Sequence, residues 1–369
     1  MKNKDRLFLD VHALQTVPPS CVNRDDTGSP KSAIYGGAVR ARVSSQSWKR
    51  AMRKKFPELI SLNNLGFRTK YVLDLVAKEI NKIEQIENAE EVAKVVLDAS
   101  GFKVKTNDDN ENQKADALFF ISTAQANALA KIAVANKTNQ LSKEAVKEAK
   151  EALRSNPSID MALFGRMLAG DTSLTVDACA QVAHSISTHK VQREYDYFTA
   201  VDDMPHNDKP GASHIDTVEF NSATLYRYAT VAVHELQKYL EGETSEAVCA
   251  FIKAFVYSMP TGRQNAFAHQ TVPNCLLVTL RSDQPVNFVG AFEKPVQSGK
   301  NNDQGYVQSS ADALVTHAKK VQEHWLAEPN KTWVTGELLK ELGEPMSLNK
   351  VIDALETEIN DYVMLGGVQ

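Results

Sequence analysis

Cysteine is scarce in this sequence: there are four in 369 residues, and no two of them are spaced as CxxC. A disulfide-dense scaffold is therefore excluded, and reduced thiols in the cytoplasm are the expected state. Long hydrophobic runs are missing as well, since no apolar stretch approaches the roughly 20 residues that cross a bilayer. Residues 1–5 lead directly into an alternating segment, without the apolar core of a signal peptide. We therefore expect a cytoplasmic protein with no membrane contact.

Familiar catalytic signatures are also missing. The chain has no GxxxxGK(S/T), no GxGxxG after a strand, no HExxH and no GxSxG motif. A strand would place His184 and His189 on opposite faces, so they are not expected to share a metal. Cys21 lies near Arg24, which could lower the pKa of its thiol, but no histidine is close in sequence to activate it. We predict no enzyme activity, no cofactor and no metal site.

Acidic residues are missing from one stretch of the chain. No Asp or Glu occurs between Thr27 and Pro57, although the whole protein carries a net charge of −4. A cluster of cations without acids is typical of a surface that binds a polyanion, because grouped cations attract phosphates. A solvated helix face that binds nothing is the alternative interpretation at this point. The same 31 residues contain eight cations: Lys31, Arg40, Arg42, Lys49, Arg50, Arg53, Lys54 and Lys55.

Two strands are predicted near the start of the chain. Period-two alternation predicts one strand at residues 7–14, which Pro18 and Pro19 should end. Loop-forming residues dominate from 20 to 37, and residues 38–43 are expected to form a second, short strand.

A basic helix is predicted next. Ser44 and Ser45 stand where an N-cap belongs, before good helix formers that run to Phe56. Helical spacing separates an apolar face, which we expect to dock, from an outward basic face. The two faces are formed by Trp48, Ala51 and Met52, and by Lys49 and Arg53.

The composition changes to Ala, Lys and Glu over residues 62–156. Helical periodicity there predicts helices at residues 71–97, 115–136 and 143–155. We expect a helical insertion of nearly a hundred residues.

Strands and helices are mixed in the rest of the chain. Residues 190–221 have little periodicity, and a structureless segment of this length is more often functional than idle. Residues 298–305 are expected to form another loop. Together the elements indicate an α+β fold, for which a ferredoxin-like or RRM-like sheet is the economical candidate. The other predicted elements are strands at 176–188 (where a helix is also compatible), 224–233 and 274–280, and helices at 245–258 and through most of 311–365.

Two pairs of loop residues are candidates for chemistry. Asp202 and Asp203 could hold Mg²⁺ for phosphodiester cleavage, but adjacent carboxylates seldom face one ion, and pinning the loop is the preferred interpretation. Met167 and Phe198 could stack on bases near a basic surface, but for each residue taken singly a place in the core is the preferred interpretation.

Three strings together carry a family resemblance. Residues 19–26 are PSCVNRDD, residues 35–37 are YGG, and residues 40–53 are RARVSSQSWKRAMR. The patterns S-C-x-N-R-D-D and R-x-R-x-S-S-Q-S-x-K-R-A-M-R, at this spacing, resemble the CasC family. That family is the repeated backbone subunit of the type I-E CRISPR Cascade surveillance complex. The match continues at residues 165–167, 183–189, 198–203, 220, 226–229 and 291–294, and weakens in the helical insertion and the last fifty residues or so.

The resemblance implies a non-catalytic protein shaped like a right hand. Several copies would line up head to tail along one guide RNA (crRNA), beside other Cascade subunits, and the guide would pair with target DNA. An RRM-like palm would comprise residues 1–62, 176–189 and 222–369, with helical fingers at 63–175 and an extended thumb loop at 190–221.

The resemblance also implies which residues hold the guide. Basic and polar donors around the predicted helix would bind its phosphates, and Met167, Phe198 and Thr199 would flank the base displaced at each thumb. Backbone contacts of this kind leave the base edges free for pairing. The complete expected RNA-binding set is Arg24, Lys31, Arg40, Arg42, Ser44, Gln46, Lys49, Arg50, Arg53, Arg166, Met167, Phe198, Thr199 and Gln264.

Two other functions stay open. One is a related backbone subunit that cleaves RNA with a divalent metal at Asp202 or Asp203. The other is a protein-interaction module whose basic helix contacts an acidic partner.

Overall fold

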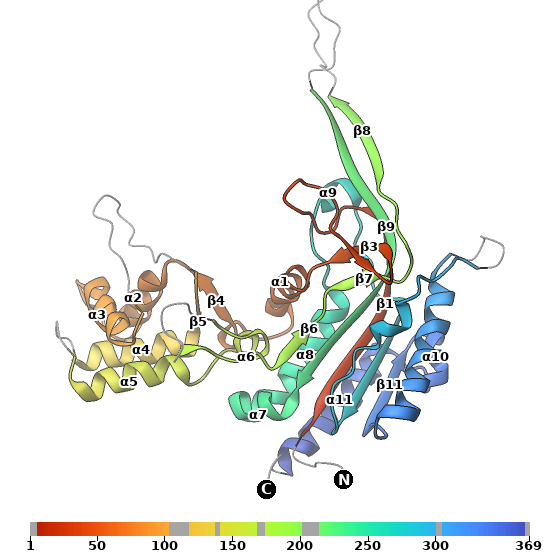
Figure 1. The fold of residues 1–369 in the computed structure, drawn as a ribbon. Helices are drawn as coiled ribbons and strands as arrows, with labels where there is room; N and C mark the ends of the chain where they lie inside the picture. Colours follow the sequence, from red (N-terminus) through yellow and green to blue (C-terminus); the bar gives the residue numbers. More distant parts are fainter. Residues whose placement is uncertain are drawn as a thin grey trace, which may run out of the picture. The chain divides into compact units, whose positions relative to one another are not determined.

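The computed structural model describes residues 6–102, 118–136, 141–167, 174–200, 214–299 and 305–365. They form an α+β fold, as the sequence predicts (Figure 1). No helix in these ranges is both long and apolar enough to cross a membrane. The chain divides into two compact units: the first comprises residues 1–54, 182–230 and 252–355, and the second comprises residues 55–181, 231–251 and 356–369.

The first unit is built on a nine-stranded sheet. Its strands follow the order β11-β10-β1-β9-β7-β3-β2, while β6 and β8 pair with β9 outside this order. β10 is buried along its whole length and pairs antiparallel with both β1 and β11. The strands are β1 (Phe8–Ser20), β2 (Ser32–Tyr35), β3 (Ala38–Val43), β6 (Ala180–Val182), β7 (Ser185–Ser187), β8 (Glu194–Ala200), β9 (His214–Ala232), β10 (Cys275–Arg281) and β11 (Lys331–Thr335).

Alternation along the strands separates two packed faces. On one face, Leu14, Tyr226 and Leu277 belong to a core that includes α10 (Val307–Trp325) and η5 (Phe288–Phe292). Helix α10 is the blue helix beside β11 in Figure 1. On the other face, Arg227 lies between Trp48 of α1 (Ser45–Lys55) and Phe255 of α8 (Thr244–Tyr257). Successive residues of β9 thus serve opposite cores, as a pleated strand requires.

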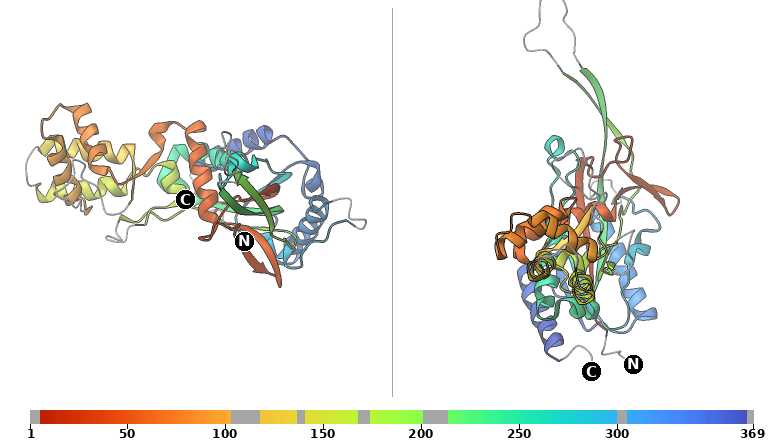
Figure 2. Two further views of the ribbon diagram at one scale, coloured as in Figure 1. Left: turned by 90° about the horizontal axis from the view of Figure 1, so that it is seen from above. Right: turned by 90° about the vertical axis from the view of Figure 1, so that its left-hand side faces the viewer.

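A long hairpin extends from this sheet. β8 pairs antiparallel with the start of β9, from Glu194↔Phe220 to Ala200↔His214. Every residue of β8 is exposed, and the paired strands project from the sheet in Figure 1 and in the right-hand view of Figure 2. The prediction of a structureless stretch at 190–221 is therefore wrong for the described residues. Because all of its residues are exposed, β8 has no buried face and therefore leaves no apolar period in the sequence.

The second unit contains the helical insertion. Four helices pack around a shared core that includes Val76, Ala93, Leu129 and Leu153. Beside them, β4 (Gly66–Thr69) and β5 (Phe119–Ser122) form a two-stranded sheet. The four helices are α2 (Val72–Ile83), α3 (Ala89–Ala99), α4 (Thr123–Asn136) and α5 (Lys143–Arg154). The remaining helical elements are η1 (Phe56–Glu58), η2 (Leu62–Asn64), α6 (Ile159–Phe164), α7 (Val233–Leu240), η4 (Glu241–Glu243), α9 (Gln264–Phe267), η6 (Glu337–Leu342) and α11 (Leu348–Met364).

Several predicted boundaries need correction. The single helix expected at 71–97 is two helices, because Glu84 adopts an extended conformation that ends α2. β1 does not end before Pro18 and Pro19 but continues through them. Its last pair with β10 is Leu14↔Cys275, so the two prolines lie where pairing with β10 needs no amide donor. Strand β5 lies within the region expected to be one helix at 115–136. The strand expected at 176–188 is two short strands, β6 and β7. Strand β11 interrupts the tail that was expected to be helical.

Candidate nucleic-acid interface

A tight hairpin carries the first cations of the predicted surface. β2 and β3 pair antiparallel through Ile34↔Val39 and Tyr35↔Ala38, and Gly36 and Gly37 at the turn have φ of +56° and +71°. Two successive positive φ values are those of a type I′ turn, which matches the twist of the strands. A Cβ on Gly36 would also come within 1.6 Å of the Glu293 carbonyl oxygen, so glycine is required there.

The basic helix α1 begins and docks as predicted. The Ser47 amide donates to Ser44 Oγ over 3.3 Å, which makes Ser44 the N-cap. Trp48, Ala51 and Met52 are buried, and the Trp48 indole N–H donates to Ser185 Oγ at 2.9 Å. Ser44 is buried and its hydroxyl caps α1. Its role in this structure is therefore to hold the start of the basic helix in place.

Asn23 links the loop at 20–26 to the hairpin and the helix. Its side-chain Oδ1 accepts from the Ser44 amide at 2.9 Å, and its carbonyl accepts from the Lys31 amide at 2.9 Å. The Lys31 carbonyl in turn accepts from the Arg42 amide at 2.9 Å. These hydrogen bonds place Arg24, Lys31 and Arg42 beside the start of α1, so the three residues lie on one surface.

Four cations of this surface have no acidic partner among the described residues. Arg24 and Arg50 are exposed, and Lys31 and Arg42 are half-buried. None of these four forms an ion pair with a residue in the described part of the chain. Gln46 is exposed, and Lys49 and Arg53 are half-buried on the outer side of α1. The region therefore presents at least four cations, Arg24, Lys31, Arg42 and Arg50, without an acidic partner in the described ranges.

The cations of this surface also act on the imidazole of His184. Arg42 Nη1 donates to His184 Nδ1 at 3.2 Å, and Arg42 Nε donates to the Ser32 carbonyl at 3.2 Å. Burial, and then the nearby Arg42 and Lys31 cations, lower the pKa of His184. A neutral imidazole is thus the acceptor that orients the Arg42 guanidinium toward this surface.

Two predicted RNA contacts are instead internal. Arg40 is fully buried, and its guanidinium donates to the carbonyls of Ser187, Thr188 and Phe292 at 2.8 to 2.9 Å. Arg166, in the second unit, is also buried and donates to the carbonyls of Leu153, Leu174 and Phe120. Burial lowers the pKa of Arg166 to about 10. Both guanidinium groups hold backbone segments together, contrary to the expectation that they face RNA. Neither the charge pattern around Arg40 nor the family resemblance at Arg166 shows whether a cation is buried.

The predicted base-flanking residues are at the surface. Phe198 and Thr199 lie on the exposed arm strand β8, where Phe198 is 39% exposed and pairs with Asp216. In the second unit, Met167 is 89% exposed at a groove of about 530 Å³ whose lining includes Phe164. Each position suits contact with a flat apolar ligand such as a base.

The loop at 261–268 adds a residue that the sequence reasoning missed. A Cβ on Gly262 would meet the Val22 carbonyl oxygen at 2.3 Å, so this loop lies directly on the loop at 20–26. Arg263, with φ of +48°, is close enough to Cys21 to act on its pKa. The predicted residue Gln264 is half-buried and bonds Gln270 at 3.2 Å. Arg263 is isolated in the sequence, and only the fold brings it to the basic surface.

The candidates for redox, metal or acid–base chemistry do not assemble. Cys21 is buried, and burial raises the pKa of its thiol above its usual value, contrary to the lowering considered from sequence. His184 is exposed whereas His189 is buried. No group of three His, Cys, Asp or Glu side chains within the described ranges could hold a metal ion. Asp202 and Asp203 lie outside the described residues.

Comparisons with known proteins show the family to which the chain belongs. Residues 9–358 match the family model described as CT1975-like protein, and the chain belongs to this family. The chain is similar to a solved protein described as "CRISPR RNA-guided surveillance complex, pre-nicking", with 32% identity, a TM-score of 0.83, and coverage of 95% of this chain and 100% of the other. A second, described as "CRISPR RNA-guided surveillance complex", has 28% identity, a TM-score of 0.62, and coverage of 95% and 99%. A search of curated proteins found no match.

Proposed function

We propose that this chain is the CasC-type backbone subunit of a type I-E Cascade complex, and that it binds guide RNA through phosphates without reading sequence. The observation that carries the proposal is the group of cations that the hydrogen bonds of Asn23 bring together. There Arg24, Lys31, Arg42 and Arg50 have no acidic partner among the described residues. Similarity to proteins of RNA-guided surveillance complexes supports RNA as the polyanion.

The chemistry of the surface suits a guide strand. Arg, Lys and Gln side chains donate hydrogen bonds and carry positive charge, which is what phosphate oxygens accept. A guide must keep its base edges available for target DNA, so it has to be held from its backbone. Exposed donors on α1 and the neighbouring loops meet that need without contacting a base edge.

The proposed assembly extends this contact along the guide. An RRM-like palm carries the basic surface, the helical insertion forms fingers, and the β8–β9 arm forms the thumb. Each thumb crosses the guide and displaces one base, which Phe198, Thr199 and Met167 flank. Adjacent copies meet head to tail, which is a contact that does not close on itself and therefore continues along the RNA.

Purification with bound RNA tests the proposal. The protein is co-expressed with a guide RNA and its partner subunits, treated with nuclease, and the protected fragments are sized while the particle is imaged at low resolution. We expect fragments of regular spacing and a filament-like particle. A protein that purifies without nucleic acid and instead binds acidic proteins through α1 would favour the interaction module.

The cleaving alternative has a separate test. Labelled RNA is incubated with the assembled protein and Mg²⁺, with Asp203→Ala as the matched variant. We propose that the chain is not an enzyme, so the RNA should remain intact in both. Cleavage that Asp203→Ala abolishes would identify a metal-dependent nuclease and refute the non-catalytic assignment.

A further inference from the structure

Helix α10 carries an apolar stripe that continues beyond the core. Ala311, Leu314 and Ala318 on this stripe are buried against the sheet. Trp325 follows Ala318 at helical spacing (i+7), yet its side chain is 81% exposed. The protein has three tryptophans, and the other two are buried. An exposed Trp at the end of a packed stripe is typical of a protein-docking anchor.

An acidic cleft lies beside this stripe. It has a volume of about 450 Å³ and is bounded by β10, β11, α10 and the segment at 328–329. Leu277, Phe288 and Ala318 contribute apolar lining, and Glu323 and Glu328 stand on its exposed rim. Both of these carboxylates flank Trp325 in sequence, one on each side.

The charge of the cleft is negative. Its two cations are already paired: Arg281 with Asp283 at 2.8 Å and Lys319 with Glu341 at 2.5 Å. Glu323 and Glu328 form no ion pair with any residue within the described ranges. RNA is therefore repelled here, whereas a cationic ligand is attracted.

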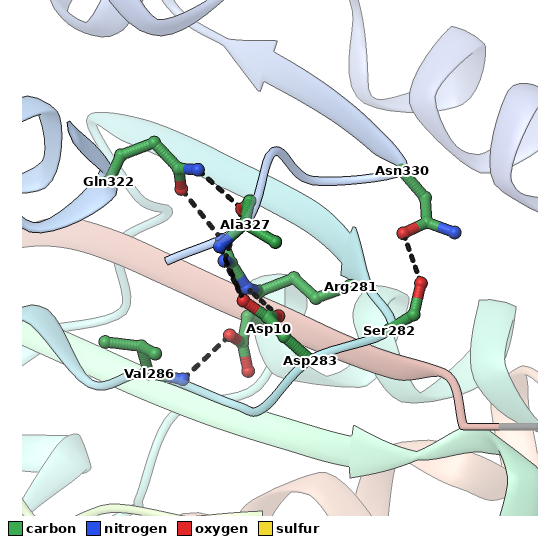
Figure 3. Close-up of polar contacts among 8 residues, drawn as sticks. All are labelled: Asp10, Arg281, Ser282, Asp283, Val286, Gln322, Ala327 and Asn330. Atoms are coloured by element: carbon green, nitrogen blue, oxygen red, sulfur yellow. Dashed lines mark hydrogen bonds and ion pairs between the residues drawn. The ribbon is translucent and has the colours of Figure 1, made fainter. Parts of the chain in front are cut away.

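Internal hydrogen bonds hold the walls of the cleft in place. Arg281 binds both oxygens of Asp283, Gln322 Oε1 of α10 at 3.0 Å, and the Ala327 carbonyl at 3.0 Å. Figure 3 shows this guanidinium at the junction of strand, helix and loop. A cleft held in this way requires little ordering when a ligand binds.

We propose that this cleft docks a positively charged segment of a partner protein. A Lys or Arg side chain of the partner lies between Glu323 and Glu328, its aliphatic stem covers the apolar lining, and Trp325 packs on the segment. The site shares no residue with the proposed RNA surface, so partner docking and RNA binding are separable.

Photo-crosslinking in the assembled complex tests the docking site. Trp325 is replaced by p-benzoylphenylalanine, the complex is purified with its RNA and partner proteins, and crosslinks are mapped by mass spectrometry. We expect a crosslink to a Lys- or Arg-containing segment of a different protein. Adding Glu323→Lys and Glu328→Lys should reduce it at least tenfold without changing the RNA content. Glu337→Lys with Glu344→Lys, which makes the same charge change at exposed positions outside the cleft, should leave it unchanged.

Fluorescence gives a second readout without a crosslinker. Trp325 is the exposed tryptophan of the chain, so acrylamide quenching of its emission should fall when partners are present, relative to a complex carrying Trp325→Phe. The proposal would be overturned if Trp325 crosslinked to nothing, or if its only crosslinks were to RNA or to another copy of this chain. Acrylamide quenching that is the same with and without partners would also overturn it.

Discussion

The guanidinium carbon of Arg227 lies 3.7 Å from the ring centroid of Trp48, the residue that docks the basic helix on the sheet. The same guanidinium stacks over Phe255 at 4.1 Å and donates to Gln15 Oε1 and to the Phe255 carbonyl, both at 2.6 Å. It is buried, and burial lowers its pKa to about 9. A buried cation that has no carboxylate partner in the described part of the chain thus supports the helix whose cations are proposed to bind RNA.

Replacing this cation should destabilise the protein. Arg227→Met removes two charge-assisted hydrogen bonds and leaves their buried acceptors unpaired, which should lower the free energy of unfolding by about 3 kcal/mol. Urea denaturation followed by Trp fluorescence measures it. Arg50→Met, at an exposed position of the same helix, should change stability by no more than about 0.5 kcal/mol. Equal stability of the two variants would contradict a supporting role for Arg227.

Arg40 and Arg42, two residues apart on β3, should respond oppositely to the same substitution. Arg40→Met removes the donors of several buried carbonyls, so it should cost about 3 kcal/mol of stability while the salt dependence of RNA binding stays the same. Arg42→Met should leave stability nearly unchanged and reduce the slope of log affinity against log salt by about 0.7. Denaturation and filter binding on both variants distinguish the two roles. A reduced slope for Arg40→Met would restore Arg40 to the RNA surface.

The sequence predicted those parts of the fold that have an apolar period or a capping signal. Helix α1, with its Ser44 cap and buried Trp48 face, was predicted within a residue or two, because both signals are local. The arm strand β8 was not, because all its residues are exposed and only its pairing with β9 defines it.

The sequence also predicted part of the candidate nucleic-acid interface. The stretch without acidic residues pointed to Lys31 and Arg42, and the family resemblance pointed to Arg24; the fold brings the three together through Asn23. Charge alone could not show that Arg40 points inward. Nor could it show that Arg263, more than two hundred residues away, joins the same surface, because both facts depend on tertiary packing.

Lys49→Ala should weaken binding to all RNA sequences alike, because a phosphate contact carries no base information. If one subunit neutralises about five phosphates, the wild-type slope against log salt should be roughly −3.5, and this variant should change it by about 0.7. Titrations with several single-stranded RNAs at increasing KCl measure both quantities. Lys331→Ala on the edge strand β11 is the control and should leave the slope unchanged. A loss confined to some sequences would show that Lys49 reads bases.

Two buried groups on β1 have opposite effects on pH stability. Burial raises the pKa of the Asp10 carboxyl from 3.8 to about 6, and Tyr228 and the Val286 amide donate to it (Figure 3 shows the Val286 bond). Burial lowers the pKa of His12 from 6.5 to about 3, and its ring bonds the Tyr226 hydroxyl. The folded state therefore binds more protons at Asp10 but fewer at His12 than the unfolded chain. Between about pH 4 and 6 the two contributions oppose each other.

Removing either group should expose the contribution of the other. The Asp10 contribution to wild-type stability is lost as pH rises, and Asp10→Asn removes that loss. The free energy of unfolding of this variant, minus that of the wild type, should therefore rise by about 3 kcal/mol from pH 4 to 6.5. The His12 contribution to wild-type stability grows as pH rises, and His12→Gln removes that gain. The free energy of unfolding of this variant, minus that of the wild type, should therefore fall by a similar amount over the same range. Urea denaturation at half-unit pH steps measures the three curves. Parallel curves would show that neither pKa is shifted by the fold.

Phe198 should govern where along the guide the protein protects RNA. The side chains of Phe198 and Tyr197 lie on opposite faces of β8, since neighbouring residues of a strand alternate. Phe198→Ala removes the apolar surface proposed to flank the displaced base, so the regular spacing of nuclease protection should blur while overall affinity falls less than threefold. Tyr197→Ala, on the same strand but the other face, should keep the spacing. Mapping cleavage on a single end-labelled guide in the assembled particle measures the spacing directly, and an unchanged pattern for Phe198→Ala, or the same change for both variants, would remove Phe198 from the proposed thumb contact.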